Sequence, residues 1–197
     1  MRPPRWGAEP QGAIRADPSS RVDAVSGDAP FTAEEVAELR QLLEIEKIRK
    51  LRTLYSQLMD LQEIEGLADL LTEDAVCEFG PHGTWRGRDE IRANWHNWFS
   101  NAAATGKGLP YGGFHMTTNL WIELVGPDSA ISRSYLQSVY HEPNPRVSPI
   151  GLFGMYDEDY RKTGGAWKIS HCRFQIFWPK RDTRDGFPRP MPRSAIG

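Results

Sequence analysis

The sequence predicts an α+β fold in which a curved, mostly antiparallel sheet wraps around a long N-terminal helix, with two shorter helices beside it. Residues 31–100 carry mainly helical spacing of apolar side chains, with one short strand pattern between the helices. Residues 115–178 divide instead into four long strand-like segments. Tight turns join the first pair and the last pair of these segments, GPD at 126–128 and TGG at 163–165. Helices followed by a meander of strands are typical of helices packed on one face of an antiparallel sheet.

The first helix is predicted over residues 31–60, where Thr32 and Glu35 form a capping-box motif. Apolar residues recur at helical spacing along it, at Leu39, Leu42, Leu43, Ile48, Leu51, Leu54, Tyr55 and Leu58. The elements expected next are a short helix over 62–71, a strand over 75–79, a turn with a short strand over 80–87, and a third helix over 88–100. The four long strands are expected at 115–126, 129–141, 150–163 and 166–178.

The length of 197 residues fits one domain with tails. Residues 1–30 are rich in Pro, Gly, Ser, Asp and Arg without a periodic apolar pattern, so we expect a disordered extension. Residues 179–197 have a similar composition with a basic bias and are expected to form a flexible tail. The folded domain is therefore predicted at 31–178. Within it, the loop 101–113 is rich in Gly and Ala and is a candidate lid.

Composition and motifs exclude several classes of function. A formal net charge of −2 argues against a nucleic-acid partner, and no apolar run approaches the roughly 18 residues of a membrane span. There is no apolar signal segment, and Cys77 and Cys172 do not look like a disulfide framework, so a reducing cytoplasm is expected. No spacing of His, Cys or carboxylates indicates a metal, and no glycine-rich loop indicates a nucleotide, so neither a metal nor a cofactor is predicted.

Four stretches in order resemble the SnoaL-like branch of the NTF2-like (nuclear transport factor 2-like) superfamily. They are YSQLMDLQEIEGLADLLTEDAVCEFG, WRGRDEI, FHMTTNLWIEL and YRKTGGAWKISHCRF, and the resemblance covers roughly residues 35–178. It implies a cone in which a long helix closes a curved sheet around a pocket. The branch includes dehydratases such as scytalone dehydratase and bile-acid 7α-dehydratase, with a dehydrochlorinase, polyketide cyclases and steroid isomerases as structural relatives. The same fold also carries binding proteins and transport factors, so it does not decide function.

Asp60 and His115 are the first candidates for catalysis. Taken alone, Asp60 fits a solvated carboxylate at a helix end, and His115 fits a strand-end histidine bonded to backbone. The resemblance implies instead that Asp60 is buried and holds His115 for acid–base work. An imidazole takes and returns a proton near neutral pH, and a carboxylate on one ring nitrogen fixes its tautomer and stabilises the imidazolium. We therefore predict a contact between these two side chains.

Tyr55 and Arg173 are supporting candidates. Tyr55 stands five residues before Asp60, as in the bile-acid enzyme's pattern, which implies a hydroxyl that donates to a substrate carbonyl; the alternative is a core aromatic. Five residues turn a helix by about 140°, so the two converge only if the helix ends or tightens near Asp60. The resemblance implies that Arg173 stabilises a leaving anion or binds a carboxylate, and surface placement is the alternative. Period-two alternation puts Arg173 in register with Trp167, Ile169 and His171. The other histidines rank lower, and they are His171, His82, His96 and His141.

Together these residues predict a cofactor-independent lyase of the dehydratase type, or a related isomerase or cyclase. The aromatic residues of the sheet and third helix suit a flat, hydrophobic ring molecule such as a steroid, terpenoid or aromatic polyketide. Two alternatives stay open: a non-catalytic small-molecule binding module, and a scaffold subunit like the small subunit of ring-hydroxylating dioxygenases. Members of this fold often pair through the open sheet face, so a homodimer or homotrimer is expected.

Overall fold

The computed structural model describes residues 30–104, 112–140, 150–181 and 188–190 of the chain. The chain divides into two units between Ala37 and Glu38. The helices are α1 (Ala33–Leu61), α2 (Ile64–Asp69) and α3 (Arg88–Ala104), with a 3-10 turn η1 (Gly80–His82). The strands are β1 (Leu71–Glu78), β2 (Thr84–Arg86), β3 (Gly113–Gly126), β4 (Ser129–Tyr140), β5 (Ile150–Thr163) and β6 (Ala166–Trp178).

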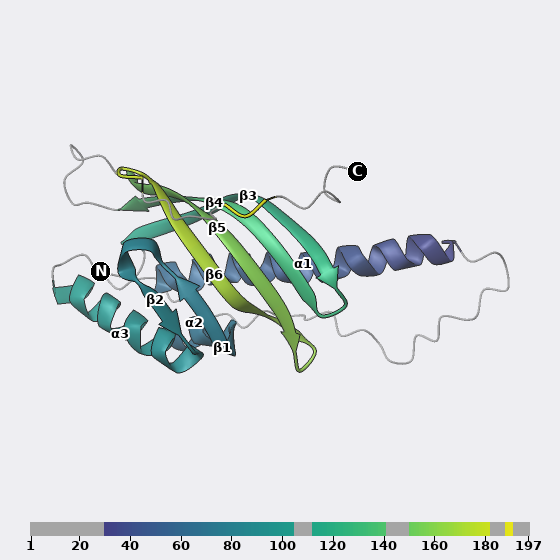
Figure 1. The fold of residues 1–197 in the computed structure, drawn as a ribbon, viewed down its shortest axis with the longest axis horizontal. Coiled ribbons are helices and arrows are strands. Elements are labelled where there is room, and N and C mark those ends of the chain that lie inside the picture. The colour runs from purple at the N-terminus through teal and green to yellow at the C-terminus, as the bar shows by residue number, and fades with distance from the viewer. Residues whose placement is uncertain (1–29, 105–111, 141–149, 182–187, 191–197) are drawn as a thin grey trace, which may run out of the picture. The chain divides into compact units, whose positions relative to one another are not determined.

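The strands form one six-stranded sheet in the order β2-β1-β6-β5-β4-β3 (Figure 1). Strands β1 and β6 run parallel, and every other neighbouring pair is antiparallel. The predicted α+β class and mostly antiparallel sheet are therefore confirmed. The predicted extension, apart from Pro30, and most of the candidate lid lie outside the described residues.

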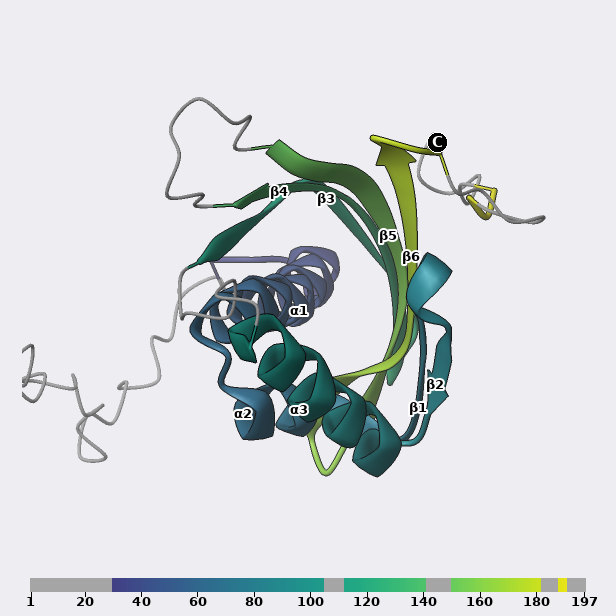
Figure 2. The same ribbon diagram turned by 90° about the vertical axis from the view of Figure 1, so that its left-hand side faces the viewer.

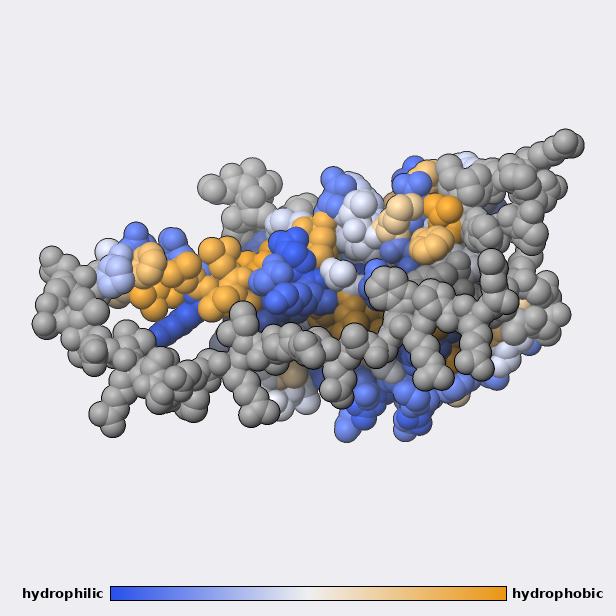
Figure 3. Space-filling model, turned by 180° about the vertical axis from the view of Figure 1, so that it is seen from behind, coloured by the Kyte–Doolittle hydropathy of each residue, from blue (hydrophilic) through white to orange (hydrophobic). Residues whose placement is uncertain are grey.

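Helix α1 begins as its capping box predicts. The backbone amide of Thr32 donates to Glu35 Oε2 at 2.7 Å, and the amide of Glu35 donates to Thr32 Oγ1 at 3.2 Å. The helix ends at Leu61, because Gln62 takes a φ of 61°, in the left-handed region that breaks a helix. Only part of its apolar face is buried. Figure 3 shows exposed apolar side chains along the N-terminal half of α1, where Leu39, Leu42 and Leu43 lie.

The concave side of the sheet faces the helices. Figure 2 shows the strands curving around α1, with α3 across the open side. The core joins side chains from all of these elements, including Ile48, Leu51, Tyr55 and Met59 of α1, Ile91 and Trp95 of α3, and Leu136, Tyr156, Ile169 and Phe174 of the sheet. Burial of this apolar surface holds the sheet in its curved form around the helix.

Two bulges change which side chains face α1. In β3, Thr118 pairs with Tyr135 and Trp121 with Arg133, so Asn119 and Leu120 together oppose a single residue of β4. Asn119 takes a φ of 52°, which an asparagine tolerates better than most residues. In β6, Asp159 of β5 pairs with His171 and Tyr160 pairs with Ile169, so Ser170 is an extra residue. Beyond each bulge, the alternation of inward and outward side chains is reversed.

Gly154 of β5 shows how tightly the core is packed. A Cβ at this position would lie 2.7 Å from Cζ of Phe174 and 2.7 Å from the carbonyl oxygen of Gln175. We expect Gly154→Ala to lower the free energy of unfolding by about 1–3 kcal/mol, because backbone and a buried ring must move. Urea unfolding measures this, with Gly66→Ala as control, since its Cβ meets only the end of the Leu58 side chain at 3.2 Å. Equal stability of both variants would contradict the packing described.

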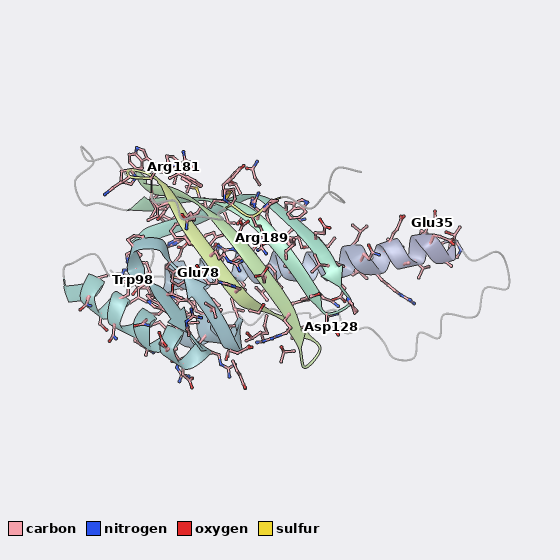
Figure 4. The ribbon with its side chains drawn as sticks, in the orientation of Figure 1. Glu35, Glu78, Trp98, Asp128, Arg181 and Arg189 are labelled. Carbon is pink, nitrogen blue, oxygen red and sulfur yellow. The ribbon has the colours of Figure 1, made fainter. Side chains whose placement is uncertain are left out.

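The outer side of the sheet binds part of the C-terminal tail. The backbone amide of Arg189 donates to Asp157 Oδ2 at 3.0 Å, and its guanidinium donates to the carbonyl of Glu158 at 2.9 Å and pairs with Asp159. Arg133 donates to the Arg189 carbonyl and pairs with Asp157 at 2.8 Å. Figure 4 shows Arg189 lying over the strands. Composition alone indicated a flexible tail, and the structure places Arg189 of this tail against the sheet.

Candidate active site

Three polar residues of α1 lie one helical turn apart and face the interior. Arg52, Ser56 and Asp60 are only 1%, 5% and 7% exposed. Their spacing of four residues puts them in one row along the helix. Each reaches a different residue of the sheet, so the row cross-links α1 to β3 and β5. Only Asp60 of the three was selected from the sequence. The missed signal is the four-residue spacing of polar residues among apolar residues that are buried.

Asp60 and His115 form the predicted contact. Asp60 Oδ1 lies 2.6 Å from His115 Nδ1, and the backbone amide of His115 donates to both carboxylate oxygens at 3.1 and 3.3 Å. A carboxylate acceptor at this distance places the proton on Nδ1. Nε2 has no hydrogen-bond partner among the described residues, and the His115 side chain is 25% exposed. Asp60 therefore orients the imidazole, and Nε2 is left unpaired among the described residues.

Ser56 and Thr117 form the neighbouring cross-link. Their hydroxyl oxygens are 3.0 Å apart. Thr117 lies two residues beyond His115 on the same face of β3, and Ser56 lies one turn before Asp60 on α1. The hydroxyl pair therefore runs parallel to the Asp60–His115 pair. Neither residue was a candidate from the sequence.

Arg52 and Glu158 form the third and most deeply buried cross-link. Arg52 Nε lies 3.1 Å from Glu158 Oε2, and both side chains are fully enclosed. The guanidinium carbon lies over the rings of two tyrosines, 4.5 Å from the ring centroid of Tyr55 and 4.2 Å from that of Tyr156. Glu158 also accepts a hydrogen bond from the Tyr160 hydroxyl at 2.7 Å. Burial opposes the charge of Arg52, but the attraction of Glu158 raises its pKa overall, so the guanidinium stays charged.

Tyr55 is buried beside this cation. Its ring contacts Trp95 edge-on at 6.2 Å between centroids. Its hydroxyl makes no hydrogen bond with any described residue. Burial is the main cause that raises the pKa of Tyr55 well above the usual range, and the neighbouring Tyr156 and Cys172 raise it further. The phenol is therefore protonated and can donate. Helix α1 ends one residue after Asp60, which was the condition for Tyr55 and Asp60 to converge. Among the described residues, however, no contact joins Tyr55 to Asp60 or His115.

Arg173 lies on the opposite side of the sheet from Trp167 and Ile169, so its predicted register with these two residues is wrong. It does share a face with His171. The extra residue Ser170 reverses the alternation after Ile169, and Cys172 and Phe174 face the core instead. Arg173 pairs on the outer side with Asp159 at 3.2 Å and donates to His171 Nδ1 at 2.8 Å. His171 in turn donates from Nε2 to Glu78 at 2.6 Å. The structure thus brings neither Arg173 nor His171 to the dyad of Asp60 and His115.

The remaining histidines lie elsewhere. His82 stacks on Trp98 with 5.0 Å between ring centroids, and His96 pairs with Glu65 at 3.2 Å on the surface. His141 lies outside the described residues. Within the described part of the chain, no group of three or more His, Cys, Asp or Glu side chains could hold a metal ion. None of the helices described is both long and apolar enough to span a membrane.

A family model described as "SnoaL-like domain" matches residues 40–173. The chain belongs to the SnoaL-like family. Among solved structures, this SnoaL-like chain is similar to an NTF2-like protein with a cystatin-like fold from Novosphingobium aromaticivorans. The identity is 20%, the TM-score is 0.64, and the match covers 77% of this chain and 93% of the other.

Two further structures carry names of enzymes. One is a candidate scytalone dehydratase from N. aromaticivorans, 24% identical with a TM-score of 0.59, matched over 73% of this chain and 90% of its own. The other is hexachlorocyclohexane dehydrochlorinase LinA-type3 from Novosphingobium barchaimii, 19% identical with a TM-score of 0.55, matched over 72% and 91%. No curated protein matches. At these identities the likeness shows a shared fold.

Proposed function

We propose that this SnoaL-like protein is a cofactor-independent lyase that removes water from a hydrophobic ring molecule bearing a carbonyl group. The observation that carries the proposal is the 2.6 Å contact between Asp60 and His115 Nδ1, with Nε2 free of partners among the described residues. Similarity to structures named as a candidate dehydratase and as a dehydrochlorinase supports an elimination reaction.

In the proposed reaction, His115 Nε2 accepts a proton from the carbon beside the carbonyl. Asp60 balances the charge of the resulting imidazolium across the short contact to Nδ1. The electron pair left on the substrate forms an enolate, to which Tyr55 would donate a hydrogen bond. Reforming the carbonyl creates the carbon–carbon double bond and breaks the carbon–oxygen bond of the β-hydroxyl. That oxygen takes the proton from His115 and departs as water.

An isomerase or a cyclase would begin with the same enolate and is the nearest alternative. A non-catalytic binding module or a scaffold subunit would not need a carboxylate that holds an imidazole whose other nitrogen is unpaired among the described residues. Asp60 is buried, and its contacts with His115 offset the cost of burying a charge.

The proposal predicts that turnover depends on the carbonyl. With bicyclic β-hydroxy ketones, we expect the wild-type protein to form the conjugated enone, which is followed by its ultraviolet absorbance. The same alcohols without the ketone should not react, because their carbon-bound proton is too weakly acidic for an imidazole. Equal turnover of both compounds, or turnover of neither, would contradict the proposed reaction.

A further inference from the structure

The hydroxyl pair of Ser56 and Thr117 lies one step from the proposed base. Ser56 precedes Asp60 by one helical turn, a rise of about 6 Å. Thr117 follows His115 by two residues, about 7 Å along the strand and on the same face. Ser56 is buried and Thr117 half-buried, so the pair lines the same interior side of the sheet as the dyad.

Counting protons shows that the pair is incompletely satisfied. Each hydroxyl carries one proton and can both donate and accept. The single contact at 3.0 Å uses one of the two protons. Neither hydroxyl makes a second hydrogen bond in the described part of the chain. The exposed Thr53 of the same helix differs, because its hydroxyl donates to the carbonyl of Arg49 in the preceding turn at 3.0 Å. One O–H group of the pair is therefore left without an acceptor among the described residues.

We infer that the Ser56–Thr117 pair donates this hydrogen bond to an oxygen substituent of the substrate, the hydroxyl that leaves. The inference rests on the proposed function, which places the reacting carbon at His115. It assigns to these hydroxyls the leaving-group role that sequence reasoning gave to Arg173. It also narrows the substrate class, because an alcohol oxygen accepts a hydrogen bond well and a carbon-bound chlorine accepts one poorly. The geometry favours elimination of water over elimination of a halide.

Binding of unreactive ring compounds tests this inference without requiring turnover. The probes are 2-hydroxytetralin and 2-chlorotetralin, which share a bicyclic skeleton and lack the activating ketone. We expect the wild-type protein to bind the alcohol about five- to tenfold more tightly than the chloride, as one neutral hydrogen bond allows. Ser56→Ala/Thr117→Val should bring the ratio of the two dissociation constants to within about twofold.

The control is Thr53→Ala/Thr118→Val, which makes the same kind of change at neighbouring exposed positions of the same helix and strand. It should leave the ratio unchanged. The inference would be overturned if the wild-type protein bound neither compound, or if its two dissociation constants differed by less than twofold. Equal effects of the two double variants on the ratio would also overturn it. His115→Ala should retain the alcohol preference, because binding involves no proton transfer. Failure of the dyad and failure of this hydrogen bond are therefore told apart.

Discussion

His115→Ala should lower enone formation by about 10³-fold or more, the largest effect expected of any single substitution in this protein. The variant loses the imidazole that Asp60 orients, and the alanine side chain cannot accept the substrate proton. Asp60→Asn should lower the rate by about 10²- to 10³-fold, because a neutral amide cannot balance the imidazolium. Its oxygen still accepts the His115 amide, so the fold should survive.

Matched controls are available on the surface. His96→Ala removes a histidine that pairs with Glu65 on the surface, and Asp128→Asn alters a carboxylate in the turn between β3 and β4. Both should retain activity within about twofold. Steady-state rates of the four variants measure the effect, and circular dichroism checks their fold. Full activity of both dyad variants would show that the proposed base is wrong.

Glu158→Gln should lower the free energy of unfolding by about 3–5 kcal/mol, the largest effect on stability expected here. The substitution leaves the Arg52 guanidinium buried between two tyrosine rings without its carboxylate. Replacing both partners, as Arg52→Met/Glu158→Leu, should restore most of that loss, because the desolvated charges are removed together.

Urea unfolding of the single and double variants measures this coupling. Asp74→Asn serves as the surface control, since its ion pair with Arg161 is largely exposed, and the cost should stay below about 1 kcal/mol. If the double variant Arg52→Met/Glu158→Leu were less stable than Glu158→Gln, the expectation would be wrong, and the loss of stability could not be explained by the unpaired charge of Arg52 alone.

The helices and the dyad were predictable because their signals are local or chemical. The capping box of Thr32 and Glu35 specifies the start of α1 through backbone amides three residues apart. Asp60 and His115 are 55 residues apart in the sequence, but their contact could be predicted for two reasons. A carboxylate complements an imidazole chemically, and the chain resembles enzymes that have such a pair. Their distance itself needed the structure.

The side assigned to Arg173 was not predictable from strict alternation, because a bulge changes the count. The apolar pattern of β6 does contain a sign of it: Trp167 and Ile169 are two apart, whereas the next core residue, Cys172, follows after three. In β3 the sign of the bulge is Asn119, a residue type that tolerates positive φ. It lies between Thr117 and the next side chain that faces the core, Leu120. Bulges of this kind depend on pairing with a neighbouring strand.

The Arg52–Glu158 pair was missed for a different reason. Arginine and glutamate are common on exposed helix and strand faces, so their burial is visible only once α1 and β5 are packed together. In hindsight, the recurrence of Arg52, Ser56 and Asp60 at four-residue spacing was a usable sign, because three polar residues occupied one face of a helix whose neighbouring positions are core.

Hydrogen–deuterium exchange into a ring ketone tests the central claim most directly, because it reports proton transfer by His115 regardless of which group leaves. A bicyclic ketone without a β-hydroxyl is incubated in D₂O with wild-type protein, and deuterium at the carbon beside the carbonyl is followed by NMR. We expect exchange well above the buffer rate with the wild type, and exchange at the buffer rate with His115→Ala. Equal exchange by both proteins would contradict proton transfer by His115.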